Sequence, residues 1–261
     1  MNETFKANAS CLFPSLHDAR RLLLPFIVCL ILTIAPQAFA LNIPEKLVFD
    51  LTWTGIKAGT ATQEIIEEEN TIRVVSTARS ADWISVFFPV EDTVESVLTK
   101  VPSPSIGVPK HYRMKTREGS RRKDREINFD HEKLKAVYID HMDGGKRTEV
   151  TISGNTYDAY SCFYYVRTLP LEVGKSVYVS ILDYDLVLNV EVQVLKKEKL
   201  DTILGKINTI LIKPLIKSEG IFERQGPIFI WLTDDARRIP VKMKTKVKIG
   251  SVTATLVGGK F

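Results

Sequence analysis

The residues best suited to chemistry gather in one short segment, Asp234-Asp235-Ala236-Arg237-Arg238. Glycosidases and aspartic hydrolases use two carboxylates that face each other across a substrate. Neighbouring residues of a strand point to opposite faces, so Asp234 and Asp235 converge only in an irregular turn. The adjacent arginines also favour ionised acids, which removes the proton donor that hydrolysis needs. The segment therefore favours a turn with local ion pairs, and a hydrolase that uses Asp234 and Asp235 is kept as an alternative.

Two stretches that alternate between apolar and polar residues flank this segment, at 228–233 and 240–249. In the second stretch lysines occupy every other position, so one face of the strand belongs to the core and the other to water. These lysines are Lys242, Lys244, Lys246 and Lys248. The residues between the strands suit a hairpin loop in which Asp234 caps its own turn through an Asx-type hydrogen bond. Asp235, Arg237 or Arg238 is expected to tie the turn to neighbouring structure.

A second polar pattern lies on a helix predicted from Tyr157 to about Leu169, with Asn155 or Thr156 as N-cap and Pro170 as stop. Its apolar arc is predicted to pack on a sheet and contains Ala159, Cys162, Phe163, Val166 and Leu169. Its other side carries a stripe that steps by three residues: Asp158, Ser161, Tyr164 and Arg167. The stripe is either the wet face of an amphipathic helix or the polar lining of a pocket between helix and sheet. We also expect its four residues to anchor the helix, as the acids and arginines anchor the turn. A nucleophilic role for Cys162 is disfavoured, because no histidine is predicted beside it.

The elements that must position these residues are nearly all strands. From Lys46 onward the segments alternate with period two or form short β-branched runs broken by turn residues. The sequence predicts roughly ten to twelve strands and one short helix at 80–90, ended by Pro89, and it leaves 141–154 as a loop or frayed hairpin. So many strands must curl to cover their edges. The predicted fold is mainly β: a large curled antiparallel sheet or partly open β-barrel with one or two short helices.

The N-terminus has the three parts of a Sec signal peptide. Arg20 and Arg21 precede a 14-residue apolar run at 22–35, and Ala38-Phe39-Ala40 is a cleavage site. The run is shorter than the roughly 20 residues that a membrane span needs. We expect residues 1–40 to be cleaved, leaving one β-rich domain, 41–261, that is soluble in the periplasm and has no transmembrane span.

Composition narrows the function classes. Only Cys162 remains after cleavage, so no disulfide forms within the chain, and no His or Cys spacing matches a metal site. No cofactor is expected. The net charge of +5 becomes +4 after cleavage, yet eight Lys or Arg residues fall within 110–125. That run is either a solvated strand face or a docking site for an anionic envelope partner; nucleic acid is not expected, because exported proteins rarely meet it.

Several motifs in order resemble a known family. They are WTGIKAG at 53–59, DAYSCFYYVR at 158–167, LGKINTILIKP at 204–214 and IWLTDDARRIPVKM at 230–243. Together they are similar to domain-of-unknown-function family 3108, a group of exported bacterial proteins. The resemblance implies a β-rich protein with a curved antiparallel sheet and assigns no activity. The positions that it marks as motif residues are Gly55, Gly59, Asp158, Ser161, Tyr164, Arg167, Trp231, Asp234, Asp235, Arg237 and Pro240.

A curled sheet with few helices can enclose a partly open cavity. The aromatic residues that could line it, or simply form core, are Trp53, Trp83, Phe87, Phe88, Phe163 and Trp231. The leading hypothesis is a non-enzymatic periplasmic carrier for an apolar or amphipathic envelope molecule such as a lipid or acyl chain. The alternatives are an assembly factor that docks an anionic partner and an envelope hydrolase. The candidate ligand-binding residues are Trp53, Asp158, Ser161, Tyr164, Arg167, Trp231, Asp235 and Arg237.

Overall fold

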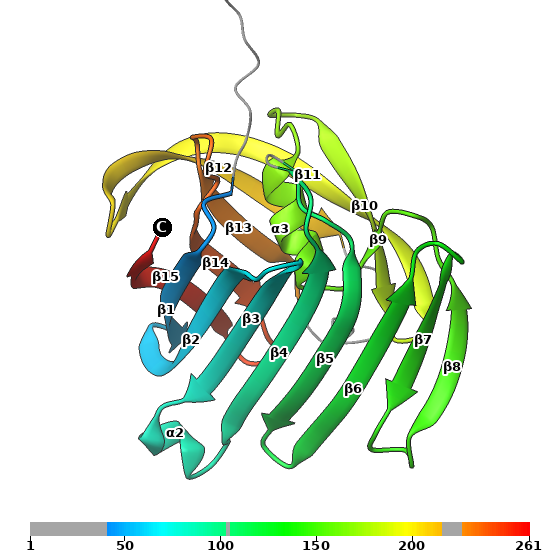
Figure 1. The fold of residues 1–261 in the computed structure, drawn as a ribbon. Helices are drawn as coiled ribbons and strands as arrows, with labels where there is room; N and C mark the ends of the chain where they lie inside the picture. The colour runs from blue at the N-terminus through cyan, green and yellow to red at the C-terminus, as the bar shows by residue number, and fades with distance from the viewer. Residues whose placement is uncertain (1–40, 103–104, 216–225) are drawn as a thin grey trace, which may run out of the picture. The chain divides into compact units, whose positions relative to one another are not determined.

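The structure is a computed structural model that describes residues 41–102, 105–215 and 226–261. The predicted signal peptide falls on residues 1–40 and lies outside this range. Within the described residues, fifteen strands form one sheet in the order β8-β7-β6-β5-β4-β3-β2-β1-β15-β14-β13-β12-β11-β10-β9 (Figure 1). Neighbouring strands are antiparallel except β9 and β10, which are parallel. The predicted curled, mainly β fold is confirmed.

The strands follow one another along the chain in two meanders. The first eight are β1 (Glu45–Trp53), β2 (Ile56–Glu67), β3 (Thr71–Ser80), β4 (Val90–Thr99), β5 (Pro109–Glu118), β6 (Arg121–Asp130), β7 (Lys135–Asp140) and β8 (Lys146–Thr151). The others are β9 (Thr156–Tyr157), β10 (Ser176–Asp183), β11 (Leu186–Thr202), β12 (Gly205–Leu215), β13 (Ile228–Thr233), β14 (Pro240–Lys246) and β15 (Ser251–Lys260). The first strand pairs with the last, Lys46 opposite Lys260. Residues 152–155 are all that separates the two edge strands, β8 and β9, so the sheet curls back on itself.

The structure has more strands than the roughly ten to twelve predicted, in part because two short segments pair as edge strands, β8 and β9. Residues 146–151 pair with β7 and form β8. The segment 141–154, which was predicted to be a loop or frayed hairpin, therefore completes a hairpin. Thr156 and Tyr157 pair with β10 instead of starting the helix. The helix α3 is therefore only Ser161–Thr168, shorter than predicted. The other helix, α2 (Asp82–Ser85), ends before Pro89 as expected.

The helix α3 lies within the curl of the sheet (Figure 1). Its Cys162, Tyr164 and Val166 belong to one hydrophobic cluster with buried residues from both meanders, among them Val74 of β3 and Val192 of β11. Burial alternates along these strands, so every second side chain points at α3. The helix thereby joins the two meanders.

Antiparallel neighbours place alternate turns at opposite ends of the sheet. One end, called the α2 end, carries α2 and the turns at 54–55, 119–120, 141–145, 184–185 and 247–250. The far end carries the turns at 68–70, 131–134, 203–204 and 234–239. The helix α3 runs toward the far end, because Arg167 in its last turn bonds the carbonyl oxygen of Arg237 there.

Candidate functional site

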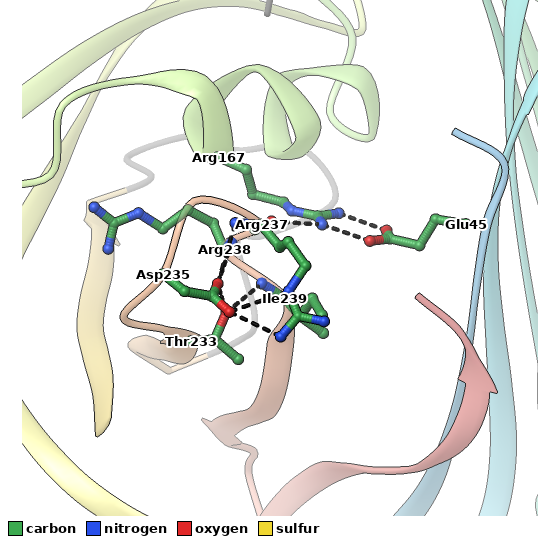
Figure 2. Close-up of polar contacts among 7 residues, drawn as sticks. All are labelled: Glu45, Arg167, Thr233, Asp235, Arg237, Arg238 and Ile239. Carbon is green, nitrogen blue, oxygen red and sulfur yellow. Dashed lines mark hydrogen bonds and ion pairs between the residues drawn. The ribbon is translucent and has the colours of Figure 1, made fainter. Parts of the chain in front are cut away.

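The carboxylate of Asp235 is the centre of the acid–arginine turn (Figure 2). Its Oδ1 accepts hydrogen bonds from Thr233 Oγ1 at 2.6 Å and from the backbone N–H groups of Arg237 and Arg238 at 3.1 and 3.2 Å. Its Oδ2 accepts from Nε and Nη2 of Arg237 at 3.1 and 2.8 Å. Ile239 N–H then donates to Thr233 Oγ1 at 2.9 Å, which closes the loop onto β13. Asp235 is thus the residue that shapes the turn.

Asp234 has the other role, so the predicted division of labour between the two acids is wrong. Its backbone N–H still bonds the carbonyl of Asn208 at 3.0 Å, which keeps the residue in the sheet. Its side chain meets Lys197 Nζ of β11 at 2.8 Å and Arg238 Nη1 at 3.5 Å. The shorter of these two contacts reaches a neighbouring strand, and the longer one stays within the turn. Asp234 therefore ties the turn to β11, and Asp235 supplies the Asx-type hydrogen bonds.

These contacts leave the turn little capacity for acid–base chemistry. Partial burial raises the pKa of Asp235, but hydrogen bonds from Thr233 and the guanidinium of Arg237 together lower it below its ordinary value. Asp235 is therefore ionised and fully occupied as an acceptor. The geometry supports a structural turn better than a pair of catalytic carboxylates.

The polar stripe of α3 begins with a carboxylate that anchors the start of the helix. Asp158 Oδ1 accepts from the backbone N–H groups of Tyr160 and Ser161, each at 2.9 Å. Its Oδ2 accepts from the hydroxyls of Ser161 and of Ser96 in β4, each at 2.6 Å. The N-cap residue of α3 is Tyr160 and not the predicted Asn155 or Thr156, and Asp158 holds the two N–H groups at the start of the helix. Burial raises the pKa of Asp158 although these four hydrogen bonds act in the opposite direction.

The stripe ends with a buried ion pair. Arg167 is 1% exposed, and its Nη1 and Nη2 donate to the two carboxylate oxygens of Glu45 in β1, each at 2.7 Å (Figure 2). Its Nη2 also donates to the carbonyl oxygen of Arg237 at 3.1 Å. A bidentate pair has fixed geometry, so it sets the position of α3 against β1 and the turn. Asp158 and Arg167 are thus tethers at the two ends of the helix.

Tyr164, between these tethers, is the candidate residue that lines a cavity. Its side chain is 1% exposed, and among the described residues its hydroxyl has no hydrogen-bond partner. Gln63 in β2 lines the same cavity, and its Oε1 also has no hydrogen-bond partner among the described residues. Burial raises the pKa of Tyr164, so its hydroxyl is protonated and can donate. Buried polar groups are nearly always paired, so these two atoms mark a place for a further polar group.

The cavity has a volume of about 360 Å³ and lies between α3 and the sheet. Most of its wall is apolar and comes from both meanders and the helix: Val74, Val94, Met114, Phe163, Val166, Val179, Ile181, Val190, Val192, Ile212, Ile228, Ile230 and Met243. Pockets of this size and composition suit small, largely apolar ligands. The sheet therefore encloses space in addition to packed core.

One end of the cavity is charged. Asp92 of β4, Glu118 of β5 and Lys123 of β6 line it, and all three are partly exposed where the apolar wall is mostly buried. Glu118 is the last residue of β5, so this end of the cavity lies toward the α2 end. Burial, together with the charge of Glu118, raises the pKa of Asp92 to about 6, against the lowering effect of the Arg117 N–H and Lys123. The cavity therefore has mostly apolar walls and one titratable, partly exposed end.

The remaining candidates lie elsewhere. Trp53 is 38% exposed and donates from Nε1 to the carbonyl oxygen of Ile249 at 2.8 Å. Trp231 donates from Nε1 to Glu198 Oε1 at 2.8 Å. Of the eight predicted ligand-binding residues, only Tyr164 lines the cavity. Of the predicted aromatic lining, only Phe163 does; Trp83, Phe87 and Phe88 are exposed at the α2 end.

The basic run at 110–125 is divided between the two faces of the sheet. On the outer face Arg113 pairs with Asp124 and Glu126, each at 2.6 Å. Lys123 points inward and lines the cavity. The run is therefore not one continuous patch of free cations.

Sequence reasoning missed Gln63, Asp92 and Lys123. All three stand at inward positions, where the alternation of β2, β4 and β6 otherwise places buried or apolar residues. Polar residues in the inward phase were the available signal. To use this signal, one must know which alternate set of side chains faces the interior of the sheet. Short strands rich in polar residues do not show which set that is.

Two further findings concern the described residues. No helix there is long and apolar enough to cross a membrane. No three His, Cys, Asp or Glu side chains in that part of the chain gather closely enough to hold a metal ion. Cys162 is a buried free thiol, and burial raises its pKa, which suits a core residue.

Comparisons with known proteins agree with the fold. No curated protein matches the sequence. A crystal structure described as a β-barrel-like protein of domain of unknown function DUF1849 from Brucella abortus is similar, with a TM-score of 0.55 and 13% identity over 85% of this chain and 98% of that chain. A candidate exported protein with a YmcC-like fold from Bacteroides fragilis covers the same shares at 9% identity, with a TM-score of 0.32 that is too low to support a shared fold.

The family comparison is more extensive. Residues 48–257 match the family described as a protein of unknown function, DUF3108. The match begins in β1, ends in β15 and includes α3, the acid–arginine turn and the strands that line the cavity. The resemblance drawn from the sequence motifs is thus confirmed, and the chain belongs to the DUF3108 family.

Proposed function

We propose that this protein is a non-enzymatic binding protein that holds an apolar or amphipathic molecule, such as a lipid or acyl chain, between α3 and the sheet. The observation that carries the proposal is the 360 Å³ cavity with apolar walls and a charged end. Burial of an acyl chain there removes apolar surface from water, while a polar head stays near the partly exposed charges. Export by the segment at 1–40 and a periplasmic location are part of the same proposal.

The unpartnered polar atoms refine the class of ligand. Tyr164 offers a hydroxyl proton and Gln63 Oε1 offers an acceptor inside an otherwise apolar wall. A ligand that carries an ester, hydroxyl or carboxyl group along its chain would satisfy one or both. A plain hydrocarbon would leave both atoms unpaired, which costs about 1–3 kcal/mol for each. We therefore favour an amphipathic ligand over a purely apolar one.

The test begins with protein purified under native conditions. Native mass spectrometry should detect a bound molecule, and extraction should identify it. A long-chain fluorescent fatty acid then serves as a probe in titrations of delipidated protein. If no molecule co-purifies and the probe does not bind, the proposal fails.

Two neighbouring valines provide a matched control. Val74 of β3 is buried and lines the cavity, whereas Val75 points to the outer face and is partly exposed. Val74→Phe should fill part of the cavity and weaken probe binding, and Val75→Phe should not. Melting temperatures are measured in parallel. Equal binding by two folded variants would show that the probe binds outside the cavity.

Tyr164→Phe tests the polar contact separately. The hydroxyl has no partner among the described residues, so its removal should leave the melting temperature unchanged or slightly raised. Loss of one hydrogen bond to the ligand should weaken binding by about 0.5–1.5 kcal/mol. Unchanged affinity would assign the ligand's polar group to another place.

A further inference from the structure

The α2 end of the sheet exposes an unusual concentration of large apolar side chains. None of the four residues of α2 is buried. Val86 and Phe87, which follow it, are 76% and 84% exposed. Other exposed apolar residues come from the turns beside α2, and together they form what we call the apolar rim: Trp53, Ile56, Trp83, Val86, Phe87, Phe88 and Ile249. Single exposed apolar residues are ordinary, but a group of this kind marks an interaction surface.

Contacts between turns hold the apolar rim together. Trp83 Nε1 donates to the carbonyl oxygen of Lys57 in β2 at 3.1 Å, which ties α2 to the β1–β2 turn. Trp53 Nε1 donates to the carbonyl oxygen of Ile249, which ties the β1–β2 turn to the β14–β15 turn. On the other side of α2, the ring of Phe88 lies so close to Gly119 that a Cβ there would meet it at 2.8 Å. The residues of the rim thus come from three neighbouring connections, and Phe88 lies against a fourth, the β5–β6 turn.

The α2 segment also has a defined conformation. The hydroxyls of Ser80 and Ser85 hydrogen-bond at 2.7 Å, and Val90 N–H donates to Ser80 Oγ at 2.9 Å. The backbone N–H groups of Phe87 and Phe88 both donate to the carbonyl oxygen of Ile84. These bonds close the segment into a compact turn whose apolar side chains face solvent. The exposure is thus built into the turn.

Cations border the apolar rim. The exposed ones are Lys57, Arg79, Arg117, Arg121, Arg122, Lys246 and Lys248. Five acids stand near them: Asp50, Asp82, Glu91, Asp92 and Glu118, of which Asp50 pairs with Lys57 at 2.8 Å and Glu91 with Arg79 at 3.6 Å. The cations outnumber the acids, so the border of the rim is positive.

We propose that the α2 end docks on the surface of an anionic phospholipid bilayer. Aromatic and aliphatic side chains at turn tips can enter the boundary between headgroups and acyl chains, where tryptophan is favoured. Lysine and arginine beside them are attracted to anionic headgroups. A bilayer suits this surface because its apolar tips can contact acyl chains while the cations beside them contact headgroups. The tips come from separate turns and form no single groove for a protein segment. A protein partner is the competing occupant that the test must separate.

Docking in this orientation would present the charged end of the cavity to the bilayer, because Glu118 and Lys123 lie at the same end of the sheet. That consequence rests on the proposed function. Docking itself does not, since the apolar rim and its cations are independent of the contents of the cavity.

The experiment uses vesicle flotation at low salt with the purified protein. One set of vesicles is pure phosphatidylcholine, and the other contains phosphatidylglycerol in addition. Val86→Ser/Phe87→Ser removes two side chains of the apolar rim that contribute little to the core because they are so exposed. The matched control is Val173→Ser, which changes an apolar residue that is 49% exposed and lies in the loop before β10, toward the far end. All variants share the parent's N-terminus, so residues 1–40 contribute equally if they are retained.

We expect the parent and the Val173→Ser variant to float with anionic vesicles, and the double variant to bind about tenfold more weakly. Arg121→Gln/Arg122→Gln should weaken binding to anionic vesicles only, and added salt should remove that difference. Tryptophan fluorescence should shift to the blue on binding, because Trp83 enters the interface. Probe binding in the cavity should be unchanged in the Val86→Ser/Phe87→Ser variant, which separates this inference from the proposed function.

Two results would overturn the inference. The first is failure of the parent to bind phosphatidylglycerol vesicles at low salt, which would leave a protein as the occupant of the rim. The second is vesicle binding that the double variant retains in full, which would place the membrane contact elsewhere on the chain.

Discussion

Individual carboxyl groups that are only partly buried differ in what holds them. Asp235 has five hydrogen bonds and a lowered pKa, whereas Asp92 accepts one backbone hydrogen bond, from Arg117 at 3.1 Å, and its pKa is raised to about 6. The first is stabilised as an ion by the fold. The second is a charge that the fold disfavours, and it stands at the charged end of the cavity.

Asp92→Asn should change how stability depends on pH. A raised pKa means that the folded state binds more protons than the unfolded state between about pH 4 and pH 6, so this group lowers stability as pH rises through that window. The variant should melt at a higher temperature than the parent at pH 7.5 and at nearly the same temperature at pH 4. Melting curves across this range are the measurement. A constant offset at every pH would mean that Asp92 acts through packing instead.

The buried pair of Arg167 and Glu45 makes a different prediction. Removal of one partner by Glu45→Gln leaves a buried cation without its counterion, which should cost about 3–5 kcal/mol in the free energy of unfolding. The double variant Glu45→Leu/Arg167→Met should recover much of that loss, because it removes both charges together. Urea denaturation of the single and double variants measures the difference. Equal losses in the two would indicate that the pair contributes mainly through packing.

At the scale of a single element, the β13–β14 turn shows how local hydrogen bonds stabilise a connection between two strands. Asp235→Ala removes acceptors for two backbone N–H groups, a hydroxyl and a guanidinium, so it should cost about 1–3 kcal/mol. Asp234→Ala removes the ion pair with the half-exposed Lys197 and a longer contact, at 3.5 Å, with Arg238. It removes no short hydrogen bond to the backbone of the turn, so it should cost less, about 1 kcal/mol. Thermal denaturation of both variants is the check. The reverse order would return the turn-shaping role to Asp234.

The elements also show where sequence reasoning succeeds and where it stops. Period-two alternation identified nearly all the strands, and Pro89 and Pro170 limited both helices, because these signals are local. The start of α3 was predicted too early because Thr156 and Tyr157 satisfy their backbone by pairing with β10, a contact more than twenty residues away. The short strand β8 was uncertain because its polar sequence has no buried face to define it.

At the scale of the whole molecule, the curl of the sheet was predictable and the contents of its interior were not. A sheet with this many strands is expected to curl and so cover its edges. The sequence singled out the helical stripe as one set, but in the structure three of its members are tethers or tether partners and only Tyr164 reaches the cavity. That distinction depends on Ser96 and Glu45, which lie far from α3 in the chain and come beside it only when β1 and β4 are in place.

The strand order has one more consequence. Starting from β9, the spatial order runs β9 to β15 and then β1 to β8, so the sheet follows the sequence everywhere except at the pairing of β1 with β15. A circular permutant that links Phe261 to residue 41 through a short linker and opens the chain at Gly154 would make every strand pair sequential. Its lower contact order should speed refolding, because the slow closure between distant chain segments is removed. The natural chain must instead complete its last strand before its first one finds a second neighbour.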